Sequence, residues 1–152
     1  SLVDLSKLRQ GASLAESLAA ELASLTERGL LTRAERDALR PNMLLAFFRS
    51  DIGQRLLHSP EVHREWPFNL RLRRQGDALL QGVIDCAFRE DDGWILLDYK
   101  TDHIHDEAAF CQRYALQLRL YADALSEITR LPVRQMWLYA LRSEKAYEIS
   151  AE

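Results

Sequence analysis

Two apolar segments that each carry one acidic residue constrain the fold of this chain more than any other feature. Residues 82–88 and 94–100 are short apolar runs interrupted by Asp85 and Asp98. Residues 90–93 between them read Glu-Asp-Asp-Gly, which is a hairpin turn signal. The second segment is apolar on both faces, which predicts a central strand with an antiparallel neighbour.

The two acidic residues are predicted to meet across this hairpin. Strand side chains alternate between faces, so Asp98 and Lys100 project from one face and Asp85 can approach Asp98 across the ladder. Two carboxylates held together repel, and burial increases that cost. A divalent cation relieves the repulsion, and oxygen ligands suit Mg2+ or Mn2+. Lys100 can then orient a nucleophilic water or stabilise charge on a phosphate.

A simpler interpretation is a structural salt bridge at the hairpin end, formed by Lys100 with Asp98 or Asp85. An Asp-x-Lys pattern alone favours this interpretation, because short motifs are weak evidence. The preceding Gly-x-x-Asp segment adds weight to a metal site, since a surface ion pair does not need carboxylates inside apolar strands. Both interpretations stay open on these residues.

The remaining pattern predicts an α/β fold. Residues 1–60 read as helices, with capping-box patterns at residues 13–16 and 32–35 and a helix start at Pro41. The elements predicted after Pro41 are a short helix at 52–57, strands at 62–72, 78–88 and 94–99, a helix at 107–128, a strand at 133–141 and an edge strand at 147–149. This order predicts one domain with a mixed central sheet flanked by helices, in which residues 61–152 form the core.

The long helix predicted at residues 107–128 contributes a third element. Gln117 and Tyr121 are four residues apart and share a face that is otherwise apolar, which predicts a buried glutamine. A buried amide needs a partner, which the sheet, a water of the metal site or a nucleotide can supply. Taken alone, a satisfied core glutamine beside a core tyrosine is the better interpretation. The apolar row of this helix comprises Phe110, Tyr114, Leu118, Tyr121 and Leu125.

Composition excludes several classes of function. The 152 residues carry a net charge of −3, which argues against a module that binds DNA by electrostatics alone but permits a metal-dependent DNA enzyme. Two cysteines are too few for a disulfide framework or an iron–sulfur cluster and suit a reducing cytoplasm. With no run of about 18 apolar residues and no secretory leader, we expect a cytoplasmic protein without a membrane span.

Weaker candidates lie elsewhere in the chain. His103 and His105 can bind a transition metal, but a solvated loop explains them better. Arg71 and Arg73 can follow a DNA backbone, and a solvated hairpin face explains them equally well.

Two tryptophans and a cysteine are expected in the core. Trp66 and Trp94 can in principle stack bases, but core packing is the better interpretation. Strand alternation puts Cys86 on the face of Ile84 and Phe88, which predicts a buried thiol that acts as a hydrophobe.

Three short patterns together resemble the RecB-type branch of the PD-(D/E)XK nuclease superfamily. They are Gly-Val-Ile-Asp at 82–85, Asp-Tyr-Lys-Thr at 98–101 and Gln-Leu-Arg-Leu-Tyr at 117–121, in this order and spacing. Residues 64–68 resemble the strand that precedes them in the family. Residues 47–53 and the upstream helices are similar to the C-terminal nuclease domain of AddA-like proteins, the A-type subunits of helicase–nucleases. The resemblance implies a restriction-endonuclease-like core.

The resemblance also implies a role for each residue that matches the family pattern. The matched residues are Asp85 and Asp98 as catalytic metal ligands, the backbone carbonyl of Tyr99 as a further ligand, Lys100 as the catalytic lysine, Gln117 and Tyr121 as DNA-contacting or supporting residues, and Glu65 as a supporting acid.

The activity that the resemblance implies is that of a Mg2+-dependent DNA exonuclease, with Mn2+ as a substitute. It would belong to a bacterial helicase–nuclease that processes double-strand break ends for recombinational repair, and ATP would serve only the helicase part outside this chain. The implied partners are DNA ends and a second, B-type subunit, and the isolated chain is expected to be monomeric. The alternative is a catalytically silent nuclease-fold module that binds DNA ends or docks a protein.

One departure from the family pattern concerns a histidine. Family members carry a metal-binding histidine on a helix near the start of the domain, and His58, His63, His103 and His105 all lie elsewhere. The chain begins near the expected end of that helix, so we expect a fragment of a longer protein with the histidine upstream of Ser1. Alone, such a chain should bind Mg2+ or Mn2+ weakly and cleave DNA poorly or not at all.

Overall fold

The computed structural model describes residues 41–72 and 78–152, and the predicted α/β fold is confirmed there. The helices predicted before residue 41 lie outside the described residues, and the division at residue 60 into a helical part and a core stays a prediction. The described elements are α4 (Pro41–Arg49), α5 (Asp51–Leu57), β1 (Val62–Leu72), β2 (Ala78–Glu90), β3 (Gly93–Lys100), α6 (Glu107–Thr129), β4 (Val133–Ala140) and β5 (Lys145–Ile149).

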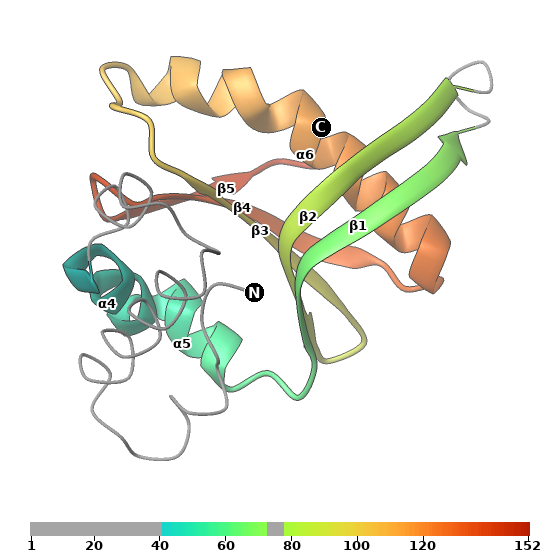
Figure 1. Cartoon of the computed structure of the whole chain (residues 1–152), viewed down its shortest axis with the longest axis horizontal. Helices are drawn as coiled ribbons and strands as arrows, with labels where there is room; N and C mark the ends of the chain where they lie inside the picture. The colour runs from blue at the N-terminus through green and yellow to red at the C-terminus, as the bar shows by residue number, and fades with distance from the viewer. Residues whose placement is uncertain (1–40, 73–77) are drawn as a thin grey trace, which may run out of the picture.

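The five strands form one mixed sheet in the order β1-β2-β3-β4-β5, with β3 in the centre as predicted (Figure 1). Neighbouring strands are antiparallel except β3 and β4, which are parallel and are connected through α6. A parallel pair needs such a crossover, which the long helix supplies. β3 is buried from Gly93 to Asp98, as expected of a strand that is covered on both faces.

Helices cover both faces of the sheet, and each face has its own apolar core (Figure 1). On the α4/α5 face, Phe47 and Leu56 cluster with Leu97 of β3. On the α6 face, Leu118 clusters with Leu96, the neighbour of Leu97 on β3. Successive residues of β3 therefore serve opposite cores. Among the described helices, none is both long and apolar enough to cross a membrane.

The ends of α6 are set by local backbone chemistry. The side chain of Asp106 caps the helix by accepting a hydrogen bond from the backbone N–H of Ala109 at 3.2 Å. Arg130 has a φ of 62° and ends the helix in the left-handed conformation, two residues before Pro132. Only residues 101–106 separate β3 from α6, so the start of the helix lies near the end of β3.

The alternation of side chains shifts by one residue midway along β1 and β2, where both strands bend (Figure 1). Ile84 and Ala87 both belong to the α6 core, although strict alternation would put residues three apart on opposite faces. On β1 the residue opposite this shift is Glu65, which has a φ of 52°. Such a φ is uncommon for a residue with a side chain and marks a local irregularity of the strand pair.

This shift corrects one prediction about β2. Cys86 does not share a face with Ile84, because the irregularity comes between them, and it packs with Phe88 on the α4/α5 face. The thiol is fully buried as predicted. Burial raises the pKa of Cys86 to about 12, so the thiol stays protonated and acts as a hydrophobe.

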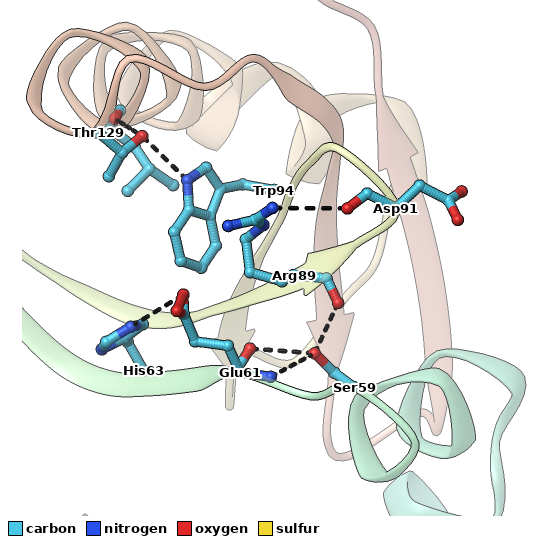
Figure 2. Close-up of polar contacts among 8 residues, drawn as sticks. Ser59, Glu61, His63, Arg89, Asp91, Trp94 and Thr129 are labelled. Atoms are coloured by element: carbon cyan, nitrogen blue, oxygen red, sulfur yellow. Dashed lines mark hydrogen bonds and ion pairs between the residues drawn. The ribbon is translucent and has the colours of Figure 1, made fainter.

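At the end of the sheet opposite Asp98, polar contacts connect β2 and β3 to the neighbouring helical segments (Figure 2). The indole N–H of Trp94 donates to the hydroxyl oxygen of Thr129 at 2.9 Å, which ties the start of β3 to the end of α6. The hydroxyl of Ser59 donates to the backbone carbonyl of Arg89 at 2.6 Å, which ties the segment after α5 to β2. Trp94 is only 2% exposed, so its predicted place in the core is confirmed and its ring is not available to stack a base.

Candidate functional site

Three charged residues meet on the α6 face, at the end of β3 that leads towards α6. The Lys100 Nζ atom lies 3.0 Å from Asp98 Oδ2, as expected for residues two apart on one strand. Asp85 comes from β2, and its Oδ2 atom accepts a hydrogen bond from the backbone N–H of Tyr99 at 3.1 Å. The carboxyl group of Asp98 is close enough to that of Asp85 to raise the pKa of Asp85. The hairpin therefore brings the two acids together.

Burial makes this pair of acids hard to ionise together. Desolvation, followed by the hydrogen bond to Asp98 and its charge, raises the pKa of Asp85 from an ordinary value of 3.8 to about 8. The N–H of Tyr99 and the charge of Lys100 lower that pKa but are outweighed. Near pH 7 the carboxyl group of Asp85 therefore keeps its proton.

The contact between Lys100 and Asp98 also fits the simpler interpretation, a salt bridge at the hairpin end. One lysine, however, neutralises only one of two carboxylates. Asp85 adds a second acid in the same buried place, where a structural ion pair does not need it. The arrangement as a whole suits a site in which a bound cation compensates the remaining charge.

The donor atoms suit a hard divalent cation. Oxygen ligands are those that Mg2+ and Mn2+ prefer, and Mg2+ is commonly held by one or two carboxylates while it keeps several waters. Within residues 41–72 and 78–152, no group of three or more His, Cys, Asp or Glu side chains could jointly hold a metal ion. The described residues therefore offer Asp85 and Asp98 as a pair, and His103 and His105 are exposed in the loop before α6.

Glu65 lies opposite Asp85 in the register of β1 and β2, because its two chain neighbours pair with Cys86 and Ile84. Its side chain is exposed, and in the described part of the chain it does not join Asp85 and Asp98 in one acidic cluster. Its predicted supporting role stays a prediction. What the structure does show is that Glu65 marks the irregularity of the strand pair next to the site.

Gln117 and Tyr121 lie beside the Gly-x-x-Asp segment of β2. The amide of Gln117 donates to the hydroxyl oxygen of Tyr121 at 3.2 Å, and the ring of Tyr121 packs edge-on against Phe68 at 5.1 Å between centroids. A Cβ atom on Gly82 would lie 2.9 Å from the Tyr121 hydroxyl and 3.1 Å from the Phe68 ring, so a side chain here would have to displace one of these rings. Gln117 itself is exposed, and the prediction of a buried glutamine is wrong, because it is the next residue, Leu118, that points into the core.

Tyr114 is a neighbour of the site that the sequence placed only in the apolar row of the helix. The Lys100 Nζ atom lies 4.1 Å from the centroid of its ring. Tyr114, Gln117 and Tyr121 are spaced by three and four residues, so the helical period already puts them on one face. The contact with Lys100 depends on the path of the loop between β3 and α6, which periodicity does not specify.

The predicted DNA-contacting arginines lie away from these acids in sequence. Arg71 is exposed on β1 and pairs with Leu79 near the far end of the β1–β2 hairpin. Arg73 lies outside the described residues. Their role in DNA binding stays a prediction.

Comparisons with known proteins agree on one family. The sequence profile of the PD-(D/E)XK nuclease superfamily matches residues 3–151. The A-type subunit of the ATP-dependent helicase/nuclease from Clostridium novyi (strain NT) is 33% identical over 149 residues, and its counterpart from Geobacillus kaustophilus (strain HTA426) is 38% identical over 140 residues. These matches cover 88% and 79% of this chain but only 12% and 11% of the relatives, so the chain spans a small part of their length.

We predict that Asp85→Asn stabilises the metal-free folded protein at pH 8 and has little effect near pH 4. Because the pKa of Asp85 is raised from 3.8 to about 8, the folded protein keeps a proton that the unfolded chain releases, and stability falls as the pH rises through that range. Asparagine carries no charge and can still accept the Tyr99 N–H. We expect a gain on the order of 2 kcal/mol at pH 8, measured by urea unfolding with a chelator present.

Asp92→Asn is a matched control, because the pKa of Asp92 is shifted in the opposite direction from that of Asp85. Asp92 is an exposed acid on the β2–β3 turn, and the guanidinium of Arg134, 2.6 Å away, lowers its pKa. Any stability that this pair contributes is present at neutral pH and is lost on acidification, so the control should show no gain at pH 8. An Asp85→Asn gain of equal size at both pH values would contradict the raised pKa of Asp85.

Proposed function

This chain belongs to the PD-(D/E)XK nuclease superfamily, and we propose that it is the Mg2+-dependent DNA exonuclease domain of an ATP-dependent helicase–nuclease. The observation that carries the proposal is the pair of carboxyl groups of the partly buried Asp85 and the buried Asp98, with Lys100 beside it. Similarity to the A-type subunits of proteins named ATP-dependent helicase/nuclease supports the helicase context. In this proposal the longer bacterial protein processes double-strand break ends for recombinational repair in the cytoplasm, together with a B-type subunit.

Asp85, Asp98 and the backbone carbonyl of Tyr99 would hold the Mg2+ ion, with Mn2+ as a substitute. When bound, the ion supplies an activated water and stabilises negative charge on the phosphate oxygens. The protein prepares its ligands in advance. The N–H of Tyr99 orients the carboxyl group of Asp85, and Lys100 orients that of Asp98, so little rearrangement is needed on binding.

Lys100 would act on the substrate. Its ammonium group lies beside the carboxyl pair, and its side chain remains 20% exposed, so a phosphate can reach it. Lysine is not a metal ligand at neutral pH. Its proposed role is therefore to orient the attacking water or to stabilise charge that develops on the phosphate.

DNA contacts would come from residues around the acids. The exposed amide of Gln117 and the hydroxyl of Tyr121 offer hydrogen bonds, and Arg71 and Arg73 offer positive charge for the backbone. A net charge of −3 gives the chain little attraction for DNA as a whole. The helicase part would compensate by delivering the strand and raising its effective concentration.

We predict that Mg2+ or Mn2+ binding at pH 7 releases about one proton, and that the release disappears at pH 9. Asp85 is mostly protonated at pH 7, because its pKa is about 8, and it must lose that proton to become a ligand. Calorimetric titrations in two buffers with different ionisation enthalpies measure the number of protons released. Binding whose proton release is absent at pH 7, or unchanged at pH 9, would show that Asp85 is not the titrating ligand.

We predict that, in the longer protein that contains this chain, Asp98→Ala and Asp85→Ala each reduce metal-dependent cleavage of linear single-stranded DNA to background. Each substitution removes an oxygen ligand, whereas the fold should persist because one of two repelling acids is gone. End-labelled DNA measures cleavage, and circular dichroism measures folding. Asp92→Ala, which removes an exposed acid of the hairpin turn, should cleave normally.

Two outcomes separate this function from its alternative. Near-normal cleavage by both aspartate variants would exclude the proposed site. An unaltered longer protein that contains this chain and binds DNA ends, but does not cleave them with either Mg2+ or Mn2+, would favour the catalytically silent module instead.

We predict that Lys100→Ala lowers the cleavage rate on the order of a hundredfold and changes metal affinity much less. The reason is that lysine contributes charge and position to the reaction but no ligand to the ion. A metal titration beside the rate assay distinguishes the two effects. A variant that loses metal affinity and recovers its rate at saturating metal would contradict the role given to Lys100.

A further inference from the structure

We propose that Tyr114 is a positioning residue for the reaction, because its ring holds the ammonium group of Lys100 beside the Asp85–Asp98 pair. This inference rests on the proposed nuclease function. It concerns a residue that the sequence analysis assigned only to the packing of α6.

Lys100 is held from two sides by different elements. Asp98, on β3 itself, lies 3.0 Å from the Lys100 Nζ atom, and the ring of Tyr114, on α6, lies 4.1 Å from it at the centroid. A lysine side chain is long and flexible, so one ion pair fixes the position of its end only loosely. A second attraction from a separate element limits the ammonium group to the space between them.

The ring of Tyr114 is itself fixed in place. Its hydroxyl donates to Asp102 Oδ2 at 2.6 Å, and Arg113 lies 3.6 Å from the same carboxylate oxygen. Phe110 packs edge-on against the ring at 5.4 Å and in turn packs against Tyr147 at 5.6 Å. The ring is therefore anchored both at its hydroxyl and at its edge.

Lys100 is a better partner for this ring than the other cation near it. The guanidinium carbon of Arg113 lies 5.2 Å from the ring centroid, and its side chain is 70% exposed. Lys100 is closer to the ring and its side chain is only 20% exposed. Cation–π attraction grows as the cation approaches the ring and loses water, so the contact with Lys100 is the stronger one.

An aromatic ring can also hold Lys100 without the disadvantages of a third carboxylate at the site. In the proposed function, Asp98 holds a metal ion and is then a weaker partner for Lys100. A third acid could hold the lysine but would also compete for the ion and add charge to a buried place. The ring of Tyr114 attracts the ammonium group without providing a metal ligand, so it can keep Lys100 in position while Asp98 is engaged.

The test compares Tyr114→Leu, which removes the ring, with Tyr114→Phe, which keeps it. The chain has three lysines, Lys7, Lys100 and Lys145, so the side-chain methylene signals of labelled lysine are few, and Lys100→Ala assigns the relevant one. The ring should shift the Lys100 signal upfield. Tyr114→Leu should abolish that shift in the isolated chain. In the longer protein that contains the chain, it should lower kcat on the order of tenfold with little change in KM. Tyr114→Phe should keep both the shift and the kcat of the unaltered sequence.

Tyr147→Leu is the matched control, because Tyr147 is a half-buried tyrosine of the same aromatic row that packs on Phe110. It should leave the Lys100 signal and kcat unchanged. An unmoved Lys100 signal in Tyr114→Leu, or an equal loss of kcat in Tyr147→Leu, would overturn the proposal. If the signals behave as expected but the unaltered longer protein cleaves no DNA, the contact is established and the nuclease function is contradicted.

Discussion

The repulsion between two carboxyl groups that are held together away from water governs the chemistry of this molecule. The backbone pairing of β2 with β3 runs from Glu90 and Gly93 to Cys86 and Leu97. Two residues beyond Leu97, the backbone N–H of Tyr99 donates a hydrogen bond to the side chain of Asp85. That carboxylate therefore satisfies a buried backbone group and faces a second acid at the same time. The fold tolerates the arrangement by keeping a proton on Asp85.

The irregular position opposite Glu65 is what lets the two acids meet. Ile84 faces α6, so strict alternation would turn Asp85 towards α4 and α5, on the other side of the sheet from Asp98. The one-residue shift between Ile84 and Ala87 instead brings Asp85 to the α6 face. A positive φ at a residue with a side chain is energetically unfavourable, and such positions are typical of sites where geometry matters more than local stability. The bend in β1 and β2 is thus part of the site.

Local patterns in the sequence were sufficient to predict the hairpin, the central position of β3 and the shared face of Asp98 and Lys100. Each of these features follows from residue spacing along one or two elements. The face of Cys86 could not be predicted in the same way, since an irregular residue in β1 changes the alternation in β2. The prediction that Gln117 is buried was wrong, because a helical period defines the apolar face only to within about one residue. The contact of Tyr114 with Lys100 depends on tertiary packing across a loop, about which periodicity carries no information.

The register of β3 has a consequence for how the site fails on heating. β3 is bonded on both sides, antiparallel to β2 and parallel to β4 as far as the pairing of Lys100 with Ala140. A slip of one residue would exchange Asp98 for Tyr99, whose ring now packs edge-on against Phe47 on the opposite face. Such a slip must break two ladders and both cores at once. The geometry of the acids is therefore tied to the packing of the whole sheet, and we expect the two to be lost together on heating.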